Sequence, residues 1–181
     1  LDVILDKYIF IKRKALSKDL CKNIIDLFER SESDNNPRGY QGVYVDADIP
    51  ELSFLSGILL PNINEYANQH DFLHRLYIPW GVTPRIFLQK YDPGKSYSGE
   101  HMEHGVEDYD CKRLLGWMFY LNDIKKDGGT RWPQQNFTTK PRAGDLYIWP
   151  AGWTHSHHGI PAPNETKYIM TGWCAGRNVD E

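Results

Sequence analysis

The chain has 181 residues, of which 40% are hydrophobic, 13% aromatic and 25% charged, and 21 basic side chains stand against 24 acidic ones for a net charge of -3. This composition is typical of a soluble globular protein, and we expect a single domain over residues 1–181. The mild acidity and the lack of a long basic run argue against a nucleic-acid partner, because such binding depends on Lys and Arg side chains that neutralise phosphates.

The length also bears on the role of any bound metal. A chain of this size buries about 70% of the surface that its unfolded form exposes, so it can build a core without a structural ion. We therefore expect a bound metal to serve function.

The three cysteines, Cys21, Cys111 and Cys174, are odd in number and form no CxxC pair. The sequence therefore predicts neither a disulfide framework nor a thiolate zinc site, which favours a reducing, cytoplasmic location. No apolar stretch approaches the roughly 20 residues that a membrane-spanning helix needs, and residues 1–16 lack the apolar segment of a signal peptide. We expect no membrane partner.

Two helices are predicted in the first part of the chain. Ser17 is a suitable N-cap, and the apolar residues between Leu20 and Phe28 fall on one helical face. A second helix is expected within residues 51–69, with a kink or break at Pro61. Residues 1–83 are therefore expected to form a helical support region.

After Pro84 the sequence changes to short runs rich in aromatic and β-branched residues, separated by Gly, Pro and Asp turns. Strands are predicted over residues 85–91, 114–122, 145–149 and 168–173. Several short strands with no helical pattern between them indicate an antiparallel sandwich or barrel. The predicted fold class is mainly β with N-terminal helices (α+β), with a β core over residues 84–176 and the helices packed on one outer face.

Histidines and an acidic residue in the β core form a candidate metal site. His101 and Glu103 lie two residues apart, so on a strand their side chains would point to the same side. Such a pair occurs about once by chance in this composition, so a third ligand is needed. His157 is the candidate, with His155 and His158 as alternatives.

Two histidines and one carboxylate form a facial triad that suits Fe(II) or Mn(II) and leaves coordination positions open for a cosubstrate and oxygen. The H-E-x-x-H pattern of zinc hydrolases does not occur in the sequence. The segment over residues 92–111, which brackets the first two ligands, is expected either to order over a substrate or to be a solvated loop.

Lys167 opens the last predicted strand. On that strand it shares one face with Ile169, Thr171 and Trp173. A lysine on an inward face is costly to bury without an anionic partner, and the carboxylate of a ligand is a natural one.

The motifs after residue 84 follow one another in a defined order: Leu88-Gln89-Lys90-Tyr91, His101-Met102-Glu103, Arg113, Tyr120-Leu121-Asn122-Asp123, Gly128-Gly129-Thr130, Trp149-Pro150, Thr154-His155-Ser156-His157, and Lys167-Tyr168 before Gly172-Trp173. In this order they resemble the Fe(II)- and 2-oxoglutarate-dependent oxygenases, particularly the prolyl-4-hydroxylase-like branch. Position 103 holds Glu where many relatives have Asp.

The resemblance implies a double-stranded β-helix, or jelly roll, in which His101, Glu103 and His157 hold Fe(II). It further implies that Lys167 binds the distal carboxylate of 2-oxoglutarate and that Tyr91 assists. The implied reaction uses O2, converts 2-oxoglutarate to succinate and CO2, and hydroxylates a C–H bond of a peptide or protein substrate, for example on a prolyl side chain. A small-molecule substrate, or a metal-binding jelly roll without turnover, remains an alternative.

Overall fold

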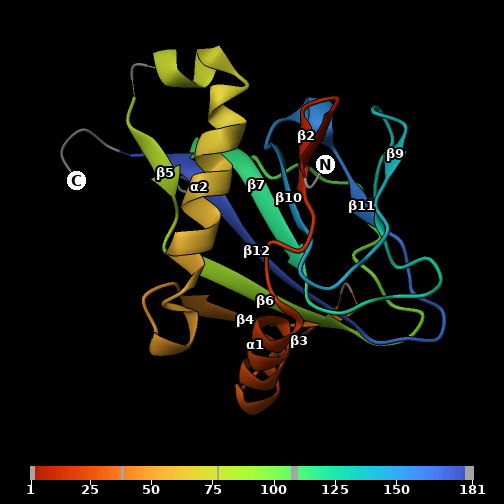
Figure 1. Ribbon diagram of the computed structural model, residues 1–181. Coiled ribbons are helices and arrows are strands. Elements are labelled where there is room, and N and C mark those ends of the chain that lie inside the picture. Colours follow the sequence, from red (N-terminus) through yellow and green to blue (C-terminus); the bar gives the residue numbers. More distant parts are fainter. Residues whose placement is uncertain (1–2, 38, 77, 107–109, 178–181) are drawn as a thin grey trace.

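The computed structural model describes residues 3–37, 39–76, 78–106 and 110–177, and in the described ranges it contains two α-helices, α1 (Lys18–Arg30) and α2 (Leu55–Asn68) (Figure 1). Short 3-10 helices are η1 (Pro50–Leu52), η2 (Asp71–Arg75), η3 (Asp110–Lys112) and η4 (Trp153–His155). The strands are β1 (Val3–Asp6), β2 (Ile9–Lys12), β3 (Asp34–Asn36), β4 (Tyr40–Asp46), β5 (Trp80–Val82), β6 (Arg85–Tyr91), β7 (Arg113–Tyr120), β8 (Thr130–Trp132), β9 (Phe137–Thr138), β10 (Leu146–Pro150), β11 (His158–Gly159) and β12 (Lys167–Gly176).

Within the described ranges, nine strands form one antiparallel sheet in the order β1-β2-β10-β7-β12-β6-β4-β3, with β5 paired to β12. A second, smaller sheet has the order β11-β8-β9. The long strand β12 pairs with both β6 and β7, which places Lys167 opposite Tyr91 and Gly172 opposite Trp117. Residues at the start of β12 therefore lie beside the end of β6.

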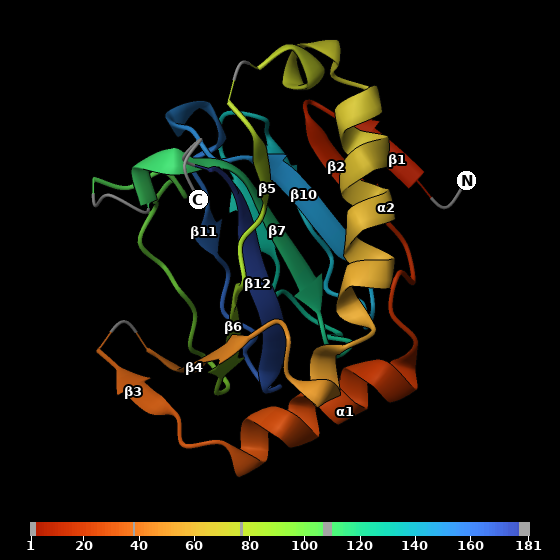
Figure 2. The ribbon, with the colours of Figure 1, turned by 90° about the vertical axis from the view of Figure 1, so that its left-hand side faces the viewer.

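Alternating side chains of the large sheet pack into two separate clusters. On β7, Leu115, Trp117 and Phe119 join a cluster that includes the apolar faces of α1 and α2, whereas Met118 and Tyr120 join a cluster on the other side. This is the two-residue period of a strand buried on both faces. We call the first side the helix face and the second the cleft face; Figure 2 shows α1 and α2 together beside the large sheet.

The predicted helices and the four predicted strands are present. Ser17 caps α1 by accepting a hydrogen bond from the Leu20 backbone N–H at 3.2 Å. Helix α2 continues through Pro61 without a break. The predicted strands correspond to β6, β7, β10 and β12, and β6 has the predicted bounds. None of the described helices combines the length and apolarity needed to cross a bilayer.

The expectation that residues 1–83 are a helical support region is wrong in part, because this region also contributes β1 to β5. These strands pair with distant ones, β2 with β10, β4 with β6 and β5 with β12. Most are only three or four residues long, which is too short to display a two-residue period.

Candidate active site

A cleft of about 330 Å³ opens on the cleft face of the large sheet. Its lining includes every residue predicted for the site: His101, Glu103, His157, Lys167 and Tyr91. Lys167, Ile169, Thr171 and Trp173 of β12 all line it as well, which confirms that these residues share one face. The structure thus brings together residues that are separated by up to 76 positions in the chain.

The three candidate metal ligands converge through backbone pairing between two loops. His101 and His157 form an isolated antiparallel bridge. The distance from His101 N to His157 O is 3.0 Å, and that from His157 N to His101 O is 2.8 Å. The backbone N–H of Glu103 donates to Ala151 O at 3.1 Å, which attaches the same loop to the end of β10. A loop carries His101 and Glu103, with an isolated bridge at His101 in place of the regular strand considered from the sequence, and pairing with the 151–157 segment fixes its course.

One ligand atom from each of His101, Glu103 and His157 lies within 4.8 Å of the other two. Among the described residues, these three side chains form the one cluster of His, Cys, Asp or Glu that could hold a metal ion. The ring centroids of the two histidines are 4.5 Å apart. His157 is 5% exposed and packs against the indoles of Trp132 and Trp149. The cluster is therefore preorganised by packing.

Hydrogen bonds fix the tautomers of both histidines. Nδ1 of His101 lies 2.9 Å from Gly99 O, and Nδ1 of His157 lies 3.0 Å from His155 O. A carbonyl oxygen only accepts, so each Nδ1 carries a hydrogen and donates it. In the neutral imidazole the lone pair is then on Nε2, the nitrogen that a metal would bind.

Nε2 of His157 lies 3.1 Å from Oε1 of Glu103. A nitrogen lone pair and a carboxylate oxygen repel each other at this distance unless a proton or a metal cation lies between them. Burial would raise the pKa of Glu103, but the hydrogen bond and charge of His157, the charge of His101 and the Trp173 N–H lower it to about 2. The carboxylate therefore stays ionised, as a metal ligand must.

Lys167 lies deeper in the cleft and is 3% exposed. Its ammonium donates to Gly128 O at 3.0 Å and lies 4.6 Å from the centroid of the Tyr91 ring. Burial lowers the pKa of Lys167 to about 8, and no carboxylate of the described residues pairs with it. An enclosed ammonium that lacks an anion fits a ligand carboxylate.

Tyr91 stands beside this lysine as the register of β6 and β12 requires. Its hydroxyl donates to Gln89 Oε1 at 2.9 Å, and burial raises the pKa of Tyr91 well above its usual value. The phenol therefore keeps its proton and can accept a further hydrogen bond from a ligand or lysine.

The alternative ligands lie elsewhere. His155 is buried, and its Nε2 lies 3.0 Å from Lys7 O while Nδ1 lies 3.1 Å from Thr154 Oγ1, so it is a core hydrogen-bonding residue. His158 belongs to β11 and pairs with Arg131. Of the 92–111 segment, residues 107–109 lie outside the described residues.

Sequence reasoning missed an aromatic wall along the cleft. Tyr40 and Tyr44 of β4 line it together with Phe87 and Tyr97. The Tyr44 ring stacks on Phe87 at 4.2 Å between centroids, and the Tyr40 ring lies 5.9 Å from that of Tyr97. The alternation of the two tyrosines with Val43 and Val45 in the sequence is the pattern that would have revealed this strand.

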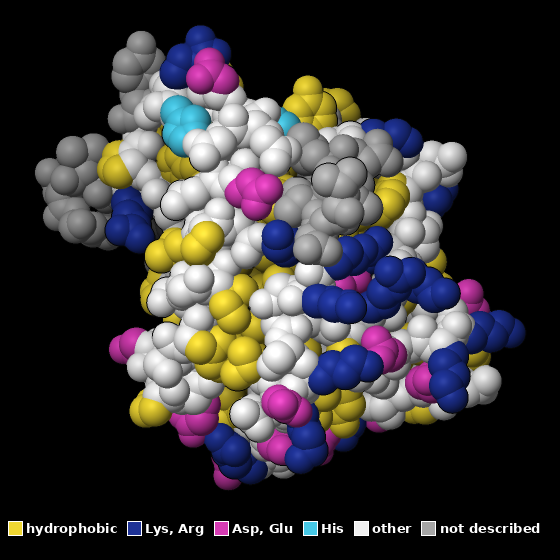
Figure 3. Space-filling view, in the orientation of Figure 1, with side chains coloured by type: hydrophobic (Ala, Val, Ile, Leu, Met, Phe, Trp, Pro, Cys, Tyr) yellow, Lys and Arg dark blue, Asp and Glu magenta, His cyan; other side chains and the backbone are white. Residues whose placement is uncertain are grey.

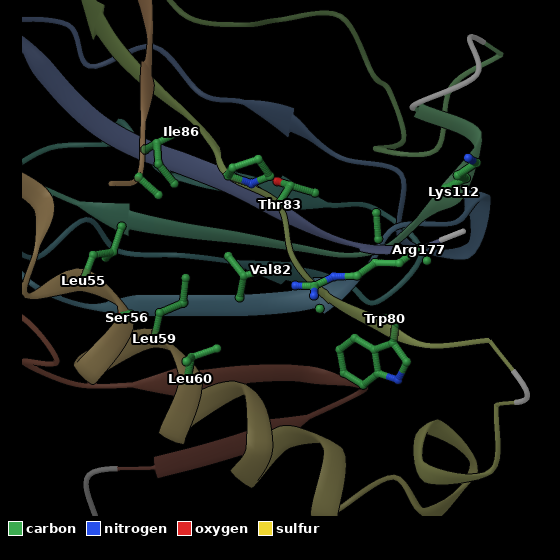
Figure 4. A pocket seen from close by; sticks show the side chains of 15 residues that line it. Leu55, Ser56, Leu59, Leu60, Trp80, Val82, Thr83, Ile86, Lys112 and Arg177 are labelled. Carbon is green, nitrogen blue, oxygen red and sulfur yellow. The ribbon is translucent and has the colours of Figure 1, made fainter. Parts of the chain in front are cut away.

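A larger cavity, of about 730 Å³, lies on the other side of the sheet between α2 and β5 (Figure 4). Leu55, Leu59 and Val82 point into it, and it lacks any His, Cys, Asp or Glu among its described lining residues. In Figure 3 hydrophobic side chains reach the surface over α2 and β5, whereas Lys and Arg gather on the other half of that face. Chemistry, and not size, identifies the smaller cleft as the candidate active site.

Comparison with known proteins identifies the family. The model of the 2OG-Fe(II) oxygenase superfamily matches residues 86–175, a range that includes both loops that carry the candidate metal ligands and all of β7 and β10. The chain belongs to the 2OG-Fe(II) oxygenase superfamily. Proteins named prolyl 4-hydroxylase or prolyl hydroxylase are among those similar to it, in agreement with the branch that the sequence motifs resemble.

A relative of this chain in Arabidopsis thaliana, named probable prolyl 4-hydroxylase 9, is 22% identical over 156 residues. The match covers 70% of this chain and 54% of that protein, so the chain spans about half the length of this relative.

Solved structures share the fold of this chain. The viral collagen prolyl hydroxylase of Paramecium bursaria Chlorella virus-1, solved as a 2OG complex, is 18% identical with a TM-score of 0.73, over 95% of this chain and 97% of that one. A Trichoplax adhaerens prolyl hydroxylase, solved with a hypoxia inducible factor peptide fragment, is 18% identical with a TM-score of 0.70, over 93% and 83%. The predicted jelly-roll fold class is confirmed.

The residues of this chain fit the cofactors that the superfamily implies. Two imidazoles with Nε2 lone pairs and one ionised carboxylate form the donor set of a non-haem Fe(II) site. The buried ammonium of Lys167 fits the second carboxylate of a dicarboxylic acid such as 2-oxoglutarate.

Proposed function

We propose that this protein is a hydroxylase that uses Fe(II), 2-oxoglutarate and O2 to hydroxylate a C–H bond on a prolyl or other amino-acid side chain of a peptide. The observation that carries the proposal is the position of three metal-binding side chains in one cleft with a buried lysine. The residues that would hold iron are His101, Glu103 and His157. When bound, iron with 2-oxoglutarate and O2 supplies the oxidation that inserts the hydroxyl group and yields succinate and CO2.

Lys167 binds the distal carboxylate of 2-oxoglutarate with a charge-assisted hydrogen bond, and Tyr91 completes the end of that pocket. The desolvated surroundings of Lys167 strengthen this contact, because the ammonium has a backbone carbonyl as its hydrogen-bond partner and little water around it. With one end fixed at Lys167, the keto-acid end of the cosubstrate is oriented toward the three ligand side chains.

The aromatic wall supports a peptide as the substrate class. Tyr40, Tyr44 and Tyr97 offer flat apolar surface with polar tips along the cleft, a surface that suits an extended or proline-rich segment. The Trichoplax adhaerens neighbour, which was solved with a peptide, supports the same substrate class.

The test is to incubate the protein with Fe(II), 2-oxoglutarate and a library of proline-containing peptides, and to measure both succinate and peptide mass. We expect succinate formation to match the number of peptides that gain the mass of one oxygen atom. A His157→Ala variant serves as the control. Peptide-independent turnover with a metabolite pool would instead assign a small-molecule substrate, and metal binding without succinate under every condition would contradict the proposal.

A further inference from the structure

The carboxylate of Glu103 accepts a hydrogen bond from the indole of Trp173. Nε1 of Trp173, on β12, donates to Oε2 of Glu103 at 2.6 Å, while Oε1 faces His157 Nε2. We propose that Trp173 is a positioning residue that fixes the rotation of the Glu103 carboxylate, so that one oxygen alone is presented to the metal. This inference rests on the proposed function.

An indole N–H is well suited to this task. It donates and cannot accept, so it binds the ionised carboxylate in one orientation only, and a hydrogen bond to a charged oxygen is stronger than one between neutral groups. With Oε2 occupied, the carboxylate cannot turn both oxygens toward the two histidines. A ligand that contributes one oxygen leaves more of the metal open for a cosubstrate.

Arg113 packs over the ring of Trp173 and holds the indole in place. Its guanidinium carbon lies 3.8 Å from the centroid of the Trp173 ring, a close cation–π contact. The same guanidinium donates to the backbone O of Glu103 at 3.1 Å and pairs with Asp110 at 2.7 Å. One arginine thus ties the indole and the backbone of the ligand into a single unit.

Gly116 provides the space that a glutamate needs here. A Cβ atom at this position would lie 3.0 Å from Cγ of Glu103 and 2.9 Å from the ring of Trp149. Cγ is the methylene by which glutamate exceeds aspartate, so the missing side chain at 116 accommodates the longer ligand. Trp149 in turn packs against His157 with ring centroids 5.2 Å apart, so a side chain at 116 would disturb two ligands.

The test compares Trp173→Phe with Trp117→Phe as a matched control. Trp173→Phe keeps an aromatic ring under Arg113 and removes the N–H that binds Glu103. Trp117 lies on the helix face, and its Nε1 has no hydrogen-bond partner among the described residues, so the same substitution there removes an equal volume and no bond. The affinity of the full chain for Co(II), and the visible spectrum of bound Co(II), are measured without 2-oxoglutarate.

We expect Trp173→Phe to weaken Co(II) binding by about 10-fold to 100-fold and to change the Co(II) spectrum, as loss of a partner that orients a metal ligand does. Trp117→Phe should retain the wild-type affinity and spectrum, whatever it does to thermal stability. Equal affinity and an unchanged spectrum in Trp173→Phe would overturn the inference.

A second variant keeps the test decisive if Trp173→Phe does not fold. Gly116→Ala leaves the indole in place and crowds Cγ of Glu103, so it should also weaken Co(II) binding and alter the spectrum. Wild-type affinity and spectrum in this variant would count against the inference. Failure of the wild-type protein to bind Co(II) would overturn the proposed function and, with it, this inference. Wild-type binding with unaffected variants would overturn the inference alone.

Discussion

The two faces of the large sheet are built from the same strands but carry different side chains. Leu88 and Met170 point to the helix face and join a continuous apolar cluster, whereas their neighbours Gln89 and Ile169 line the cleft. The cleft face also carries the buried ammonium of Lys167. Because adjacent residues of a strand point to opposite sides, stability and chemistry can be assigned to alternate positions of one sequence.

The two faces also contribute differently to the free energy of unfolding. Burial of apolar surface on the helix face stabilises the fold by roughly 25 cal/mol per Å². The cleft face also buries an apolar cluster, but it places the ammonium of Lys167 where water is scarce, which is costly until a ligand supplies an anion. The larger apolar cluster lies on the helix face, so substitutions on the two faces should have separable effects.

The largest expected effect is the loss of activity in His157→Ala. Loss of a metal ligand removes the several kcal/mol of charge stabilisation that a bound metal supplies, so turnover should fall by at least about a thousandfold. The free energy of unfolding should change far less, because the larger apolar cluster packs on the helix face. Succinate release and denaturant unfolding measure the two quantities.

His155→Ala is the matched control for this prediction. It removes an imidazole that binds Lys7 O and lies outside the ligand cluster, so Co(II) binding should persist. Full activity in His157→Ala would transfer the third ligand to His155 or His158.

Leu88→Ala tests the helix face. This side chain is 1% exposed, and its truncation should lower the free energy of unfolding by about 2–5 kcal/mol through lost burial and the cavity that remains. Co(II) affinity, measured under conditions where the variant is folded, should equal that of the wild type. A tenfold loss of affinity would show that the two faces are not independent.

The fold was predictable where a strand is long and its pattern is complete in the local sequence. The bounds of strand β6 could be predicted because its seven residues are followed directly by a turn. Helix α1 could be predicted from its N-cap and its apolar face. Strands β1 to β5 were missed because each is short or lies in a region with helical neighbours. β2, β4 and β5 also pair with strands far away in the chain, and that pairing cannot be read locally.

The site was predictable in part for the same reason. The His101 and Glu103 pair is local, and the shared face of β12 follows from its two-residue period. The indole that binds Glu103 depends on where a loop meets a strand 70 residues further on, which no local pattern encodes. The choice of His157 over His155 came from ordered motifs, and the tautomers became visible only with the carbonyl partners in place.

Lys167→Met should make the protein more stable. The pKa of the buried lysine falls from 10.5 to about 8, so at pH 7 the charged form costs the folded state about 3 kcal/mol as an upper value. Methionine fills a similar volume without charge, and we expect the free energy of unfolding to rise by about 1–3 kcal/mol. Affinity for 2-oxoglutarate should fall sharply.

The pH dependence of that gain is defined. A lysine whose pKa is lower in the folded state destabilises the fold by the full amount when the pH is below the folded-state pKa. It does not destabilise the fold when the pH is above the unfolded-state pKa. The advantage of Lys167→Met should therefore be complete below pH 8 and vanish as the pH rises to about 10.5. A constant difference across this range would show that another effect of the substitution is being measured.

The smallest effect is the pH dependence of 2-oxoglutarate binding. Only the ammonium form of Lys167 attracts the distal carboxylate, and its pKa of about 8 means that the free protein loses this form as the pH rises above 8. Affinity should then fall by about tenfold per pH unit, or about 1.4 kcal/mol.

Lys167→Arg stays charged throughout, so its affinity, although lowered by the longer side chain, should be independent of pH. Titrations of the Mn(II)-loaded proteins between pH 7 and about 9.5 compare the two slopes, and changes in the metal site are common to both. Parallel slopes would assign the pH dependence to the metal ligands and remove Lys167 as the anchor of the cosubstrate.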